Sequence, residues 1–138
     1  MTEHRTPLAA TLEWDGEQQF TGFIGKHEVS MDGAADAAIT PVQMLALAVS
    51  GCMAIDLVHI LERGRHAATS LKGAFEGERA TTEPKRFVRI RLHFTLTGPM
   101  KPEHVERALQ LSREKYCSVW ASMNPEIQLE TTFEIAED

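Results

Sequence analysis

The chain has 138 residues, of which 43% are hydrophobic and 25% charged, and its formal net charge is −6. This size and composition predict one globular domain over residues 1–138, and the acidic balance argues against a nucleic-acid partner. The segment Met1–Leu12 carries charges and lacks the apolar stretch of a signal peptide, so we expect a cytoplasmic protein.

The first forty residues predict a small antiparallel sheet. Apolar and polar residues alternate through three short segments, and the turn signals Asp15-Gly16 and Gly25-Lys26 separate them. We expect strands over residues 8–14, 20–24 and 27–31, followed by a loop of small residues over 32–39.

The stretch from Thr40 to Arg65 predicts one long helix. Thr40 and Gln43 form a capping-box pattern, and Gly64 marks the expected end. Because the residues between these signals are apolar nearly all round, most of the helix surface should be buried. Asp56 interrupts the apolar run near its middle, which argues against a membrane span.

The second half predicts two strands, a second helix and a last strand. Alternation is clearest between Val88 and Leu96, whose even-numbered residues are apolar. The second helix should carry an apolar stripe. The stripe consists of Val105, Ala108, Leu109, Ser112 and Tyr116. The expected elements are strands 70–79, 86–97 and 127–135 and a helix over 102–116, which gives an α+β fold.

Two cysteines are the candidate functional residues. Cys52 lies in the middle of the long helix and Cys117 at the end of the second helix, 65 residues later. No CxxC motif is present, so spacing alone leaves structural packing, a redox pair and metal binding open. Arg113 lies one helical turn before Cys117, whereas His59 is about 10 Å along the axis from Cys52, too far for direct contact.

Three phrases and the order of the elements carry a family resemblance. TPVQMLALAVSGCMAIDLVHIL, EPKRFVRIRLHFTLTG and LSREKYCSV resemble the OsmC/Ohr family of osmotically inducible and organic hydroperoxide resistance proteins, closest to its YhfA-like branch. The resemblance implies an intertwined homodimer with two long central helices packed against antiparallel sheets from both subunits. It also implies Cys52 as the peroxidatic and Cys117 as the resolving cysteine, an organic hydroperoxide substrate and an external dithiol reductant. We expect no cofactor and no metal.

The sequence departs from the family's peroxidases in two features. They carry Glu after the proline that opens the central helix, where this chain has Val42, and they use an N-terminal Arg, for which this chain offers Arg5 or Lys26. We therefore expect weaker activity toward organic hydroperoxides, because the cysteine thiolate has less support. The alternative hypothesis is a non-catalytic protein that binds an apolar small molecule at the dimer interface.

Overall fold

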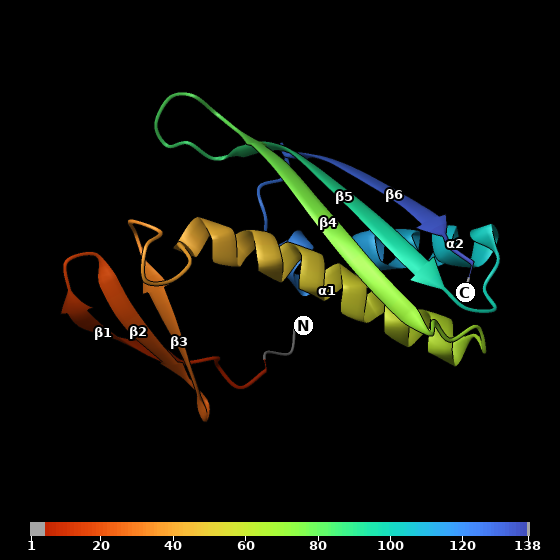
Figure 1. Cartoon of the computed structure of the whole chain (residues 1–138), viewed down its shortest axis with the longest axis horizontal. Helices are drawn as coiled ribbons and strands as arrows, with labels where there is room; N and C mark the ends of the chain where they lie inside the picture. Colours follow the sequence, from red (N-terminus) through yellow and green to blue (C-terminus); the bar gives the residue numbers. More distant parts are fainter. Residues whose placement is uncertain (1–4, 138) are drawn as a thin grey trace. The chain divides into compact units, whose positions relative to one another are not determined.

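The computed structural model describes residues 5–137 of the chain (Figure 1). Its contacts group into two compact units, one that ends at Leu45 and one that begins at Ala46. The strands and helices follow the order β1–β2–β3–α1–β4–β5–α2–η1–α3–β6, which confirms the α+β class. The expectation of a single domain over the whole chain stays a prediction.

The first unit contains the predicted three-stranded meander. Strands β1 (Ala10–Gly16), β2 (Gln19–Ile24) and β3 (His27–Asp32) are antiparallel and adjacent in chain order. Their register places most of the apolar side chains on one face of the sheet. That face includes Leu12, Trp14, Phe20, Val29 and Met31. Leu12 and Trp14 are more than half exposed, so the chain leaves part of this apolar face uncovered.

The long helix α1 (Pro41–Arg63) begins and ends close to the predicted residues. The capping box is formed, since Gln43 N–H donates to Thr40 Oγ1 over 3.1 Å and Thr40 N–H donates to Gln43 Oε1 over 2.9 Å. The C-terminal cap differs from the prediction, because the left-handed residue is Arg65 (φ 66°) rather than Gly64. His66 N–H donates to the Leu61 carbonyl over 2.8 Å and completes a Schellman motif.

The second unit contains the sheet β4–β5–β6, formed by β4 (Ser70–Arg79), β5 (Phe87–Thr97) and β6 (Gln128–Ile135). The predicted alternation in β5 is confirmed, since four alternate apolar side chains are buried. These are Ile90, Leu92, Phe94 and Leu96. β4 and β5 are antiparallel, but β6 runs parallel to β5, so the sheet is mixed rather than purely antiparallel. A parallel neighbour requires a long crossover, and the helical segment between β5 and β6 supplies it.

The crossover differs from the single helix predicted over residues 102–116. Helix α2 (Pro102–Leu111) ends in a π-helical turn, η1 (Ser112–Tyr116), and a short helix α3 (Ser118–Ala121) follows Cys117. Cys117 N–H donates to the Ser112 carbonyl over 2.8 Å, which is the i to i−5 bond of a π-helix. This wider turn was not visible in the apolar pattern.

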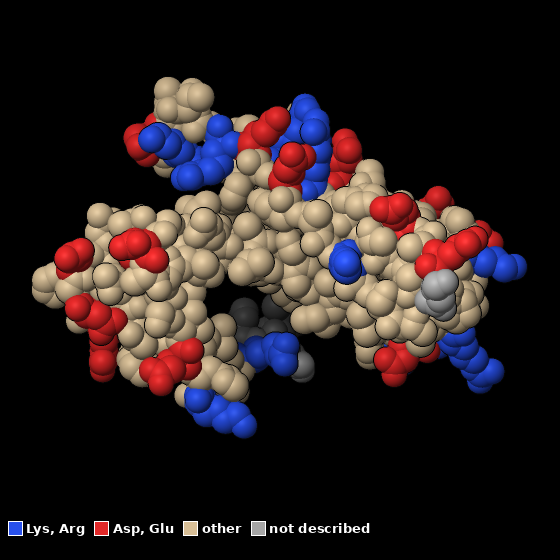
Figure 2. Space-filling view, in the orientation of Figure 1, with Lys and Arg blue, Asp and Glu red and all other residues tan. Residues whose placement is uncertain are grey.

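The burial predicted for α1 is not reached within one chain. Four of its side chains are buried, namely Val49, Met53, Leu57 and Leu61. Leu47, Ile55 and Val58 are 65%, 69% and 44% exposed, and the surface along α1 carries few charged residues (Figure 2). By length and mean hydropathy α1 also resembles a membrane-spanning helix, a test that core helices of soluble proteins pass as well.

Candidate functional site

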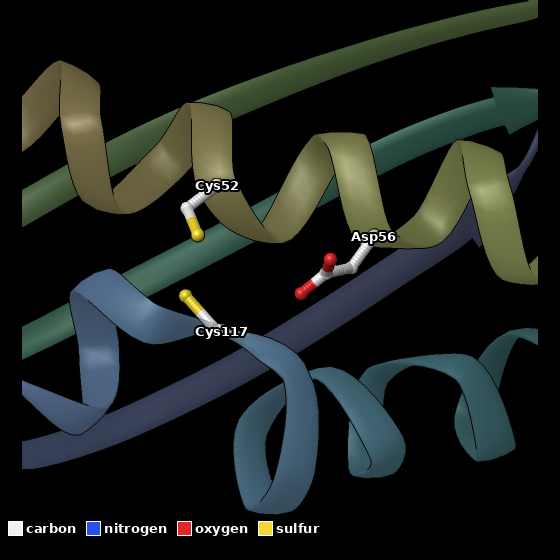
Figure 3. A group of neighbouring side chains, drawn as sticks. All are labelled: Cys52, Asp56 and Cys117. Carbon is white, nitrogen blue, oxygen red and sulfur yellow. The ribbon is translucent and has the colours of Figure 1, made fainter. Parts of the chain in front are cut away.

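The two cysteines lie next to each other in the second unit. The Sγ atoms of Cys52 and Cys117 and a carboxylate oxygen of Asp56 all lie within 4.8 Å of one another. Figure 3 shows the two sulfurs pointing toward each other, one from the middle of α1 and the other from the junction between η1 and α3. Both thiols are free. A small movement would therefore bring them to disulfide distance.

The π-helical turn explains why Cys117 reaches this place. The regular stripe of α2 places Ser112 inside, and a continued α-helix would place Tyr116 inside next. In a π turn the inward position falls one residue later, so Cys117 is 3% exposed while Tyr116 is 49% exposed. The prediction that Tyr116 belongs to the buried stripe was therefore wrong.

The environment of Cys117 keeps its thiol protonated at neutral pH. Burial, followed by the neighbouring Cys52 thiol, raises the pKa of Cys117 to about 11, and the Asp56 carboxylate contributes in the same direction. One contact opposes these effects, since Trp120 N–H donates to the Cys117 sulfur over 3.3 Å. Cys117 is thus a neutral thiol, and the N–H of Trp120 is placed to stabilise its thiolate when one forms.

Asp56 is the site residue that sequence reasoning did not select. Its place four residues after Cys52 puts both side chains on one face of α1, and that spacing was the available signal. The hydroxyl of Ser112, which is fully buried, donates to Asp56 Oδ2 over 2.8 Å. This bond fixes the carboxylate at the site.

The residues described include no cation paired with this carboxylate. Among residues 5–137, no Lys, Arg or His forms an ion pair with Asp56 within 4.0 Å. Arg113, one turn before Cys117, lines surface hollows with residues of β6 instead. His59 is exposed and lines a different hollow with Ile55 and Val58, so the structure does not bring it to Cys52.

The three groups also form a partial ligand set for a thiophilic ion. Cys52, Asp56 and Cys117 each offer one ligand atom. A closed structural zinc site has four protein ligands, and two of these three would have to be thiolates. Among the described residues these three groups supply three ligand atoms, one fewer than such a site needs.

Fold and site together define a small α+β protein whose paired thiols are consistent with redox chemistry. A family model described as OsmC-like protein matches residues 31–132. The chain is 35% identical to protein YhfA of Escherichia coli strain K12 over 131 residues, which cover 93% of this chain and 98% of YhfA. The chain therefore belongs to the OsmC-like family.

Solved structures agree with this assignment. A hypothetical protein from Aquifex aeolicus VF5 superposes with a TM-score of 0.89 at 25% identity, over 97% of this chain and 99% of that one. An organic hydroperoxide resistance protein OsmC from Legionella pneumophila superposes with a TM-score of 0.72 at 15% identity, over 96% and 99% of the two chains. At that identity the second comparison supports the fold alone.

Proposed function

We propose that this protein reduces organic hydroperoxides in the cytoplasm, with Cys52 as the peroxidatic and Cys117 as the resolving cysteine. The observation that carries the proposal is the approach of two thiols, 65 residues apart in sequence, to within 4.8 Å. Organic hydroperoxides are the proposed substrates because an organic hydroperoxide resistance protein from Legionella pneumophila shares this fold.

The proposed chemistry uses the peroxide as the oxidant and a dithiol as the reductant. Cys52 sulfur attacks the distal (OH) oxygen of the hydroperoxide, and an S–O bond forms as the O–O bond breaks. The proton lost from the Cys52 thiol goes to the departing alkoxide, so the products are a Cys52 sulfenic acid and an alcohol. Cys117 sulfur then attacks the Cys52 sulfenic acid, and a disulfide and water form. An external dithiol reduces the disulfide and becomes oxidised itself.

The pair of cysteine variants tests this assignment. Cys52→Ser should abolish loss of an alkyl hydroperoxide in the presence of a dithiol, because no other group attacks the peroxide. Cys117→Ser should allow one oxidation per chain and then stop as a sulfenic or sulfinic acid, visible by mass spectrometry. The proposal would be contradicted if Cys52→Ser kept the wild-type rate of hydroperoxide loss. It would also be contradicted if the wild type consumed the hydroperoxide no faster than a free thiol does.

Activity should be weaker than in relatives that carry the Glu and Arg named above. Val42 has no charge with which to position a guanidinium, and an unassisted thiol with a pKa of about 8.5 is a few per cent ionised at neutral pH. Val42→Glu alone should therefore have little effect unless a cation also reaches Cys52. The second-order rate with tert-butyl hydroperoxide measures this.

We also propose that the protein is a homodimer. Leu47, Ile55 and Val58 on α1 and Trp14 on β1 are exposed in the single chain. Full burial of an exposed apolar side chain contributes about 1.5–3 kcal/mol, and each of these would contribute the share that corresponds to its exposed fraction. Light scattering with sedimentation at decreasing concentration should give twice the chain mass. Ile55→Asp should shift the mass toward the monomer, and Ala74→Asp on the polar face of β4 is the matched control; a monomer mass for the wild type would refute the dimer.

The alternative, a non-catalytic module for an apolar small molecule, has one specific observation in its favour. A hollow of about 460 Å³ lies beside α1, lined mainly by apolar side chains that include Ala54, Ile55, Val58 and Leu71. Thiol titration with an alkyl hydroperoxide separates the two hypotheses. Rapid loss of two thiols per chain supports catalysis, and unreactive thiols together with saturable binding of an apolar fluorophore support the module.

A further inference from the structure

The Asp56 carboxylate lies where a base for the resolving step is needed. It shares one face of α1 with Cys52, and its oxygen lies within 4.8 Å of the sulfurs of both cysteines (Figure 3). That separation allows a direct thiol–carboxylate contact after a small side-chain rotation, or a bridge through one water. Among the described residues these two thiols are the titratable groups shown to lie against Asp56.

Cys117 needs such a base because its thiol is neutral. A disulfide forms when a thiolate attacks, so a protonated Cys117 must lose its proton before or during the attack on Cys52. Burial is the largest cause of the raised pKa of Cys117 and persists when Cys52 is oxidised, so the Cys117 thiol stays mostly protonated at pH 7. Attack through the free thiolate alone would therefore be slow.

Ser112 holds the carboxylate in an orientation suited to this role. Its buried hydroxyl donates to Oδ2 of Asp56, and no hydrogen bond to Oδ1 occurs among residues 5–137. The carbonyl of the same Ser112 accepts the N–H of Cys117. One residue of the π-helical turn thus anchors both the carboxylate and the backbone of the cysteine.

We propose that Asp56 is the general base for the resolving cysteine, an inference that rests on the proposed roles of Cys52 and Cys117. As the Cys117 Sγ–Cys52 Sγ bond forms, the Cys117 S–H bond breaks and its proton moves to the Asp56 carboxylate. The Cys52 S–O bond breaks with its electron pair on oxygen. The leaving hydroxide then takes the proton from Asp56, which regenerates the carboxylate and yields water.

The negative charge of Asp56 makes it possible to distinguish a base from a purely electrostatic role by whether Asp56→Asn speeds or slows the attack of Cys117. By its charge alone, Asp56 raises the pKa of Cys117 and lowers the amount of thiolate. If charge were its whole effect, Asp56→Asn would make Cys117 attack faster. If Asp56 removes the proton, the same substitution makes the attack slower. The two roles therefore predict changes in opposite directions.

The experiment follows the resolving attack without any hydroperoxide. The reduced full-length protein is mixed with 4,4′-dithiodipyridine, whose first thiopyridone is released when a mixed disulfide forms on Cys52. The second thiopyridone is released when Cys117 attacks that disulfide, and this leaving group needs no proton. Cys117→Ser should release one equivalent only. Because no peroxide is used, failure of the proposed peroxidase activity and failure of this inference remain distinguishable.

In the wild type, the rate of the second release should be nearly independent of pH between about 6 and 9, because the proton of Cys117 moves to Asp56 during the attack and need not first be lost to solvent. Asp56→Asn should be about tenfold or more slower at pH 7, and its rate should rise about tenfold per pH unit. Asp56→Glu, which keeps the carboxylate, should restore part of the flat profile. Glu106→Gln, which removes an exposed carboxylate from α2, should match the wild type.

Two results would overturn the inference. One is an Asp56→Asn protein that releases the second thiopyridone as fast as the wild type or faster. The other is a wild-type rate that itself rises tenfold per pH unit between pH 6 and 9, a result that requires no variant to fold. A flat wild-type profile that Asp56→Glu retains supports the base even if Asp56→Asn is unstable.

Discussion

The buried thiol of Cys117 should react with alkylating reagents as slowly as its high pKa dictates. Its pKa of about 11 lies well above that of an ordinary cysteine, so at pH 8 its thiolate fraction is about one hundredth or less of that of an unfolded cysteine. Iodoacetamide reacts with the thiolate. The rate of alkylation of Cys117 in the reduced, folded protein should therefore rise about tenfold per pH unit until the pH approaches 11. In the urea-unfolded chain the rate of alkylation should stop rising at a lower pH.

Mass spectrometry of the tryptic peptide after Lys115, residues 116–138, measures Cys117 separately from Cys52. Burial also shields the sulfur, but shielding lowers the rate by the same factor at every pH and leaves the midpoint unchanged. The midpoint is therefore the decisive quantity. Cys52→Ser should lower it while leaving it above 9, because burial is the largest cause of the shift. A wild-type midpoint at or below about 9 would refute this account of the site.

Three further substitutions probe the stability of the fold. Backbone N–H groups of the following loop hold the pKa of Asp32 below its ordinary value, so its stabilisation is present above about pH 4 and is lost as the pH falls through the folded pKa. The difference in urea stability between wild type and Asp32→Asn should accordingly shrink from pH 7 to pH 3; a constant difference would contradict this. Gly77→Ala places a methyl group 2.6 Å from Phe87 and 2.8 Å from Phe75, and should lower the free energy of unfolding by about 1–3 kcal/mol; an unchanged value would count against the packing described. Arg65→Gly should raise that free energy by about 1 kcal/mol, because glycine adopts the left-handed φ of 66° without strain, and thermal unfolding measures the gain or its absence.

The elements with strong local signals were predicted from the sequence. The capping box at Thr40 and Gln43 forms from side chains three residues apart, so tertiary context is not required to recognise it. The alternation in β5 reflects one buried and one solvated face, and that period survives in the structure. The α+β class and the order of the main strands and helices could be predicted from such local spacing of apolar residues.

The parts that were missed depend on contacts distant in sequence. A parallel or antiparallel partner for β5 gives the same alternation in β6, so the sequence carries no signal for the direction of that strand. The π turn after Leu111 changes the phase of a helix by one residue, and the apolar stripe through Ser112 fits both phases. This change exchanges Tyr116 for Cys117 at the inward position, and so the candidate site itself depends on a feature without a local signature.

The same turn links the fold to the proposed chemistry. Two thiols and a hydroperoxide yield a disulfide, an alcohol and water, so both thiol protons end on the products and none needs to be released to solvent. A site without a cation beside its thiols has little thiolate at rest, and it gains most from a group that accepts a proton and returns it within the step. Asp56, held by Ser112 and adjacent to both sulfurs, has the position required for that exchange. Under the proposed mechanism, therefore, the π turn places the proton acceptor and the resolving thiol together, and a continuous α-helix through Tyr116 would separate them.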